Sequence, residues 1–342
     1  MDLMELYRET AKRLSRIDLD SLFRGFSPLR FAVYSGNECC LDGELIEKPA
    51  AFVANTSVEY EGGQVAIWDV SHGIGDLDEF AASMVHEMFH GFQNLSGESR
   101  YPDENAALRD YVYSAKNVSL KLKEAELMRN IVENGDKASC DTLLSMRKRR
   151  LMDFPFEYRY EAATEQIEGT ANYIELAALF AIAPEKAAMR WKRLFERILD
   201  PKEYFPIRIV SYLTGAAFIE CANRMGGPDF DTFKNEPYAV EAVTEAPAYE
   251  GNIETDPAVS QAMESFIDET KRIIEAAVEK NDVVLNERRR LASVNIWDAR
   301  RLGDLVTSNF FVAYIDDGEW KPLYGDFVVE LDGEYIKKVY RR

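Results

Sequence analysis

The chain has 342 residues and a formal net charge of −19 at pH 7, and 46% of its residues are hydrophobic. This composition predicts a folded protein of two or three domains and excludes a disordered or fibrous chain. The acidic balance argues against nucleic acid and membrane surfaces as partners, because phosphate groups require clustered Lys and Arg. Two short basic runs, residues 147–150 and 288–290, stand beside acidic stretches, and we interpret them as solvated helix faces or ends.

No stretch approaches the roughly 20 consecutive apolar residues that a membrane-spanning helix requires. The N-terminus is acidic and amphipathic, unlike a secretory signal, so we expect a cytoplasmic protein. The 4 cysteines have no CxxC spacing, which predicts reduced thiols and gives no support to a cysteine-based zinc site.

A helical stripe over residues 3–17 is followed by extended runs. These runs predict the strands of a small, mostly antiparallel sheet: residues 30–34, 51–55, 57–60 and 64–70. We assign residues 1–75 to this N-terminal helix and sheet.

The next part of the chain is predicted to be helical. Asp76 and Glu79 fit a capping box that begins a helix, which should end near residues 96–97. Residues 104–150 are expected to form a helical hairpin, broken at 134–135 and inserted between two parts of one site. Further helices are predicted after this hairpin: residues 155–180, 184–198, 206–225 and a long helix from 255. Residues 76–285 form this helical body.

Short strands return at the end of the chain, over residues 310–315, 326–331 and 335–340, and Asp-Gly pairs separate them. They predict a C-terminal β-module over residues 286–342. The expected fold class is therefore α+β.

The chain contains 3 histidines, and two of them stand in His86-Glu87-Met88-Phe89-His90, an HExxH sequence. Helical geometry brings residues four apart to one face, so both imidazoles can reach one ion. Glu87 points elsewhere and can address a water on the metal as general base. The alternative, two buried core histidines, is disfavoured because burying histidine without a partner is costly.

A catalytic zinc site needs a third protein ligand. The remaining histidine, His72, lies in a short turn that we expect to be merely solvated. Glu161, Glu165 and Glu168 fall on one face of the predicted helix, where a cation would relieve their repulsion. Glu168 is the preferred ligand, and Glu165 or a simple exposed acidic stripe remain as alternatives.

HExxH followed by Glu168-Gly169-x-Ala171 resembles the gluzincin, thermolysin-like metallopeptidases, and in motif form most of all the aminopeptidases of the leukotriene-hydrolase type. The resemblance implies a zincin-like fold in which His86, His90 and Glu168 hold Zn²⁺. It also implies an oxyanion-stabilising tyrosine, for which Tyr212 in Tyr212-x-x-Gly215 is the match, and an edge strand that pairs with substrate, for which residues 64–70 are expected. The amino-terminus-binding segment of those aminopeptidases is absent, so the resemblance does not extend to exopeptidase specificity.

The sequence thus predicts a zinc metallopeptidase acting on a peptide or protein substrate, with Glu87 and Tyr212 as catalytic residues. A non-catalytic zincin-fold protein that binds metal or peptide is the alternative. Hydrolysis of a non-peptide amide is a third reading.

Overall fold

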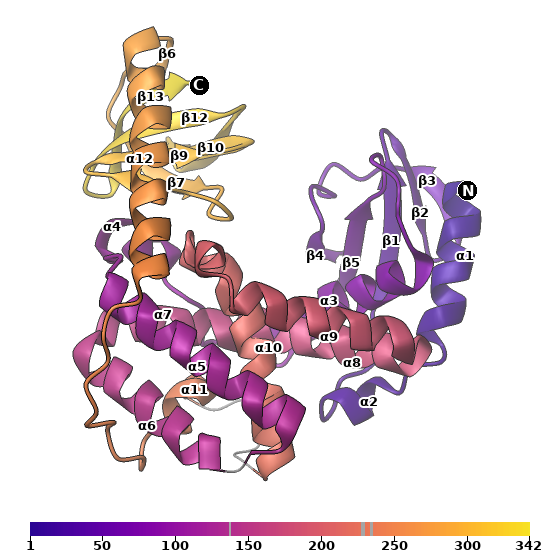
Figure 1. Ribbon diagram of the computed structural model, residues 1–342. Coiled ribbons are helices and arrows are strands. Elements are labelled where there is room, and N and C mark those ends of the chain that lie inside the picture. Colours follow the sequence, from indigo (N-terminus) through magenta and orange to yellow (C-terminus); the bar gives the residue numbers. More distant parts are fainter. Residues whose placement is uncertain (137, 227–229, 233–234) are drawn as a thin grey trace.

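The computed structural model describes residues 1–136, 138–226, 230–232 and 235–342. Its architecture is α+β, as predicted: an N-terminal mixed sheet, a helical middle and a C-terminal antiparallel sheet. The two sheets stand apart from each other on one side of the helical layer, as Figure 1 shows.

The N-terminal sheet has five strands in the order β3-β2-β1-β5-β4. Their bounds are Arg30–Ser35 for β1, Glu38–Leu41 for β2, Glu44–Glu47 for β3, Thr56–Tyr60 for β4 and Gly63–Asp69 for β5. Only β1 and β5 pair in parallel, and the other neighbours are antiparallel. The sheet is therefore mixed, with a majority of antiparallel pairs.

The prediction of a strand over residues 51–55 is wrong. The Phe52 N–H donates to the Pro49 carbonyl in a turn, and the Phe52 side chain is fully buried against one face of the sheet. Phe52 therefore covers one face of the sheet and is not part of a strand. The hairpin of β2 and β3 was missed, although its turn carries the Asp42-Gly43 pair with both φ angles positive.

The other face of the sheet packs against two helices, α1 (Leu3–Leu14) and α3 (Leu77–Leu95). Alternate strand residues such as Phe31, Val33 and Ala66 supply this buried face. The helix that carries HExxH is thereby fixed on a rigid support.

The remaining helices form a layer that packs on α3 mainly through α8 and continues to residue 280. Its helices are α2 (Leu19–Leu22), α4 (Glu104–Asp110), α5 (Ala115–Asn134), α6 (Ala138–Asp153), α7 (Pro155–Thr164), the π-helical turn η1 (Glu165–Gly169), α8 (Thr170–Ile182), α9 (Pro184–Ile198), the short 3₁₀ turn η2 (Pro201–Tyr204), α10 (Ile207–Met225), α11 (Tyr238–Glu241) and α12 (Pro257–Lys280). The predicted break at 134–135 is confirmed, because α5 ends on Gly135 in the left-handed conformation. In the described parts of the chain no helix is both long and apolar enough to cross a membrane.

The C-terminal sheet is larger than predicted, with eight antiparallel strands. They are β6 (Val283–Leu285), β7 (Arg289–Val294), β8 (Arg301–Leu302), β9 (Leu305–Ser308), β10 (Phe311–Asp316), β11 (Glu319–Tyr324), β12 (Phe327–Asp332) and β13 (Tyr335–Arg341). The three predicted strands correspond to β10, β12 and β13. One face of the sheet docks on α12, where Ile274 and Ala277 pack against Val328 and Tyr340.

Candidate metal centre

The helix α3 brings His86 and His90 together, one turn apart. Asp76 caps this helix, and its carboxylate accepts from the Asp78 and Glu79 N–H groups at 2.9 and 3.1 Å. The Nε2 atoms of the two imidazoles lie 3.1 Å apart, as the four-residue spacing predicts. Both imidazole rings therefore direct Nε2 toward the same point.

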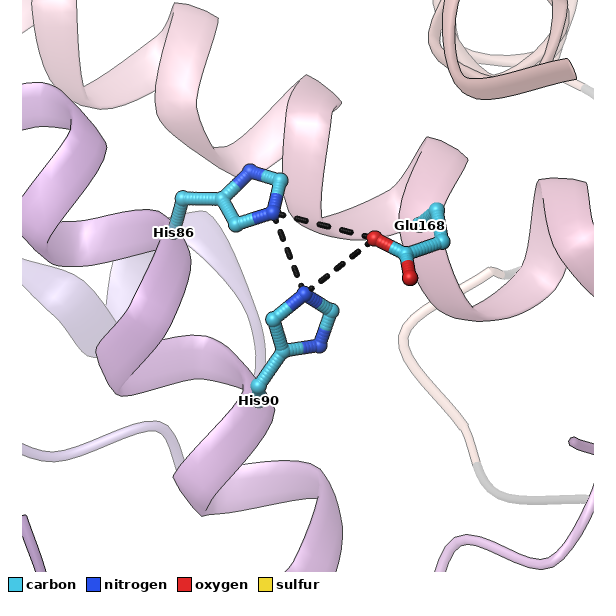
Figure 2. A group of neighbouring side chains, drawn as sticks. All are labelled: His86, His90 and Glu168. Carbon is cyan, nitrogen blue, oxygen red and sulfur yellow. Dashed lines mark hydrogen bonds and ion pairs between the residues drawn. The ribbon is translucent and has the colours of Figure 1, made fainter. Parts of the chain in front are cut away.

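Glu168 closes a triangle with the two histidines, as Figure 2 shows. Its Oε2 lies 3.4 Å from His90 Nε2 and 3.9 Å from His86 Nε2. Two ligands at zinc–nitrogen or zinc–oxygen distance in a tetrahedral site are about 3.3 Å apart. The two distances that involve His90 Nε2, 3.1 and 3.4 Å, match this value, and the distance of 3.9 Å between His86 Nε2 and Glu168 Oε2 is longer. The three atoms therefore have the chemistry, and approximately the spacing, of one face of a zinc coordination tetrahedron.

The opposite side of each imidazole faces an acceptor. His90 Nδ1 lies 2.8 Å from Gln93 Oε1, and His86 Nδ1 lies 3.2 Å from Glu175 Oε2. The Gln93 amide also donates to the Ile167 carbonyl at 3.2 Å, which fixes its orientation. An acceptor at Nδ1 favours the tautomer protonated there, which leaves the Nε2 lone pair available for a metal.

Glu175 and Gln93 were not singled out from the sequence. Glu175 stands seven residues, about two helical turns, after Glu168, and Gln93 stands one turn after His90. Helical spacing from each predicted ligand is the signal that could have found them.

Arg208 holds the second oxygen of Glu168. Its Nη2 lies 3.2 Å from Glu168 Oε1 and 3.3 Å from Glu104 Oε1. This ion pair occupies Oε1 and leaves Oε2 turned toward the histidines. Arg208 was also missed, although it lies one helical turn before Tyr212 on α10.

The electrostatic surroundings favour a cation. Burial lowers the pKa of His86, but the carboxylates around it, Glu175 foremost, raise it to about 9. Burial would raise the pKa of Glu168, but its hydrogen bond with His90 and the nearby positive charges lower it to about 2. The site thus holds a proton on His86 that a divalent ion could replace.

The three candidate ligands line a cleft of about 880 Å³ that also contains Glu87 and Tyr212. Burial raises the pKa of Glu87, and the two histidines oppose that shift. Burial and the neighbouring Glu168 carboxylate raise the pKa of Tyr212, so its hydroxyl remains a proton donor at neutral pH. Both predicted catalytic residues therefore lie in the same cleft as the candidate ligands. His72 is exposed and does not line it.

The predicted edge strand was misplaced. Strand β5, over residues 64–70 in the prediction, pairs with β1 on one side and β4 on the other, so β4 forms the edge. The two strands themselves were predicted, over residues 57–60 and 64–70, but a local pattern cannot say which of them joins the rest of the sheet. Residues 55–57, at the start of β4, line the cleft.

The prediction that Glu161, Glu165 and Glu168 share one helix face is wrong. The chain passes through the π-helical turn η1, where the Thr170 N–H donates to the Glu165 carbonyl five residues back. A wider turn rotates Glu168 away from the preceding carboxylates. Such turns are frequent at functional sites.

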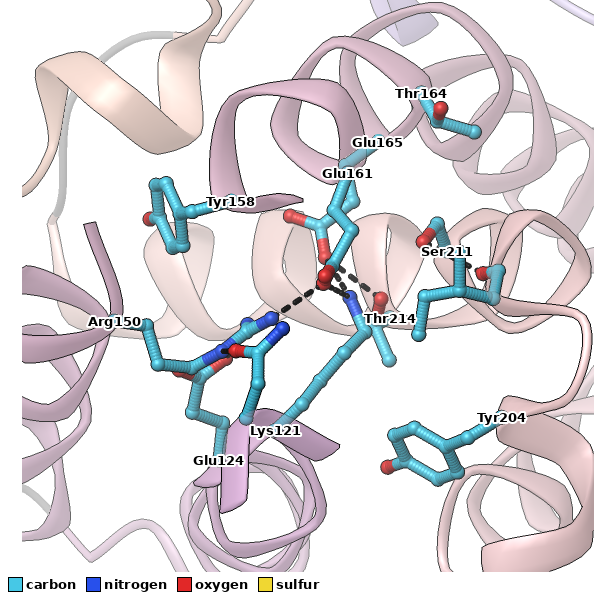
Figure 3. Close-up of polar contacts among 12 residues, drawn as sticks. Lys121, Glu124, Arg150, Tyr158, Glu161, Thr164, Glu165, Tyr204, Ser211 and Thr214 are labelled. Carbon is cyan, nitrogen blue, oxygen red and sulfur yellow. Dashed lines mark hydrogen bonds and ion pairs between the residues drawn. The ribbon is translucent and has the colours of Figure 1, made fainter. Parts of the chain in front are cut away.

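Glu161 and Glu165 point instead into a buried ion-pair cluster (Figure 3). Lys121 Nζ lies 2.9 Å from Glu161 Oε2 and 3.0 Å from Glu165 Oε1. Arg147 Nη1 lies 2.8 Å from Glu165 Oε2, and the Thr214 hydroxyl donates to Glu165 Oε1 at 2.7 Å. Because both oxygens of Glu165 are engaged there, Glu168 is the candidate third ligand.

The basic run at residues 147–150 is therefore only partly solvated, contrary to the interpretation from the sequence. Arg147 and Arg150 are each 1% exposed, and Arg150 pairs with Glu161 and with Glu124 at 2.6 and 3.1 Å. Arginine can be buried in this way because fixed carboxylates compensate its charge. The hairpin of α5 and α6 thus supplies the cations that neutralise the carboxylates preceding Glu168.

Comparisons of the chain with models of protein families, with curated proteins and with solved structures gave no match.

Proposed function

We propose that the chain is a zinc-dependent metallopeptidase of the gluzincin type, in which His86, His90 and Glu168 hold the ion. The observation that carries this proposal is the convergence of His86 Nε2, His90 Nε2 and Glu168 Oε2 at 3.1 to 3.9 Å. When bound, zinc supplies Lewis-acid polarisation of a carbonyl and lowers the pKa of water to about 7.

The residues of the chain itself perform the proton transfers. Glu87 accepts a proton from the attacking water and delivers it to the departing amine. The Tyr212 hydroxyl donates a hydrogen bond to the oxyanion of the tetrahedral intermediate. The free edge of β4 offers main-chain groups to an extended substrate, and residues 55–57 line the cleft at that point.

Glu87 supports an enzyme over a protein that only binds metal or peptide. Burying a carboxylate costs free energy, and Glu87 is 9% exposed beside the candidate ligands. A purely structural zinc site would gain nothing from this residue.

The test combines metal analysis of the purified chain with cleavage of a mixed peptide library, with and without a chelator. Glu87→Gln should retain zinc and lose turnover at least about 100-fold, because it removes the general base. Glu79→Gln, on the same helix outside the cleft, is the matched control and should cleave as the wild type does. A chain without bound metal, or a Glu87→Gln protein of full activity, would contradict the proposal.

A further inference from the structure

The C-terminal sheet contributes to the cleft. Ile296 and Trp297, in the connection between β7 and β8, line the same cavity as His86 and Glu168. Trp297 is 49% exposed. A large exposed aromatic side chain in a ligand cleft is typical of a contact surface.

Trp297 contacts Tyr212, which separates it from the candidate ligand Glu168. Its ring lies edge to face with Tyr212, with centroids 5.5 Å apart and planes at 87°. Tyr212 in turn lines the cleft together with the candidate ligand Glu168. A substrate group beside Trp297 would therefore be close to the bond undergoing hydrolysis.

The backbone holds this tryptophan in place. The Trp297 N–H donates to Asn295 Oδ1 at 3.2 Å, and the Asn295 N–H donates to Ser308 Oγ at 2.9 Å. Ser308 is fully buried in β9. The connection is thus anchored to the core of the C-terminal sheet, which favours a preformed contact.

Apolar side chains line the cleft together with Trp297. They are Ile296 and, one turn apart on α10, Ile209 and Leu213. The polar residues 55–57 line the cleft at the edge strand β4. This arrangement suits a peptide whose main chain pairs with β4 while an apolar side chain rests on the tryptophan.

We propose that Trp297 is a specificity-determining residue that selects peptides with a bulky apolar side chain next to the scissile bond. This inference rests on the proposed peptidase function. It makes the C-terminal sheet a part of the substrate site.

The test uses the full-length zinc-loaded protein and internally quenched peptides in which each position carries Phe, Leu, Ser or Asp in turn. Trp297→Ala should lower kcat/KM for the Phe and Leu peptides about 10- to 100-fold, mainly through KM, and leave the Ser and Asp peptides unchanged. Trp297→Phe should restore most of the loss. The matched control is Trp320→Ala, which removes a similarly exposed tryptophan of the same sheet, 53% exposed, outside the cleft. Zinc content and thermal stability of each variant exclude misfolding as the cause.

The possible outcomes distinguish a failure of this inference from a failure of the proposed function. A wild type that cleaves peptides, with a Trp297→Ala variant of unchanged selectivity, overturns the inference alone. An equal loss of kcat for every peptide also overturns it, because Trp297 would then act only by positioning Tyr212. A wild type that binds zinc and cleaves no peptide overturns the proposed function, and this inference with it.

Discussion

Gly169 and Gly215 face each other where η1 crosses α10. A Cβ built on Gly169 would lie 2.7 Å from the Gly215 Cα, and one built on Gly215 would lie 2.8 Å from the Gly169 Cα. The glycines of Glu168-Gly169 and of Tyr212-x-x-Gly215 therefore let two backbones approach closely. This contact sets the position of Glu168 relative to Tyr212.

Gly215→Ala should destabilise the protein by about 1–3 kcal/mol, because the added methyl group meets backbone that cannot move independently. Urea denaturation followed by circular dichroism measures the loss. Gly75→Ala is the control, since a Cβ there meets no atom within 4 Å. Equal stability of the two variants would show that the helices separate without cost.

Glu175→Ala should weaken zinc binding about 10- to 100-fold, because outer-shell partners of ligating histidines orient the ring and raise its basicity. His86 Nδ1 loses the carboxylate oxygen that lies 3.2 Å away. Competition with a fluorescent chelator gives the affinity. The exposed Glu185→Ala should bind zinc as the wild type does. An unchanged zinc affinity in Glu175→Ala would show that Glu175 does not support zinc binding by His86.

Glu165→Gln should lower the free energy of unfolding by about 3–5 kcal/mol at pH 7, because it leaves buried cations without a compensating charge. The solvent-accessible, half-buried pair of Arg149 and Asp153, 2.8 Å apart, supplies the control. Asp153→Asn should cost less than about 1 kcal/mol. Similar losses of unfolding free energy in Glu165→Gln and Asp153→Asn would mean that the ion-pair cluster around Glu165 reorganises without cost.

The difference in stability between wild type and Glu165→Gln should shrink in acid. Burial raises the pKa of Glu165, but Arg147, Lys121 and Thr214 outweigh it and hold the pKa well below its usual value of 4.5. A depressed pKa stabilises the fold above the unfolded-state pKa, and this contribution is lost as pH falls toward the folded-state value. Urea titrations at pH 7 and at stepwise lower pH test this prediction. A constant difference through pH 3 would contradict it.

Local sequence patterns were sufficient to predict the elements whose conformation depends on neighbouring residues. Asp76 predicts the start of α3, the left-handed Gly135 ends α5 at the predicted break, and each of the three late strands begins or ends at an Asp-Gly turn. The proximity of His86 and His90 also follows from one helical turn. These features need no information about distant parts of the chain.

The paired histidines, the adjacent Glu87 and the α+β succession of elements could be predicted from the amino-acid sequence, because helical and strand periodicities are local. The packing of distant segments is what places Glu165 against the buried Arg147, turns Glu168 toward the histidines and makes β4 the edge strand. The π-helical turn changes the rotation of the helix, and strand order depends on pairing between distant segments. The burial of Arg147 likewise required partners on other helices, which no stretch of neighbouring residues reveals.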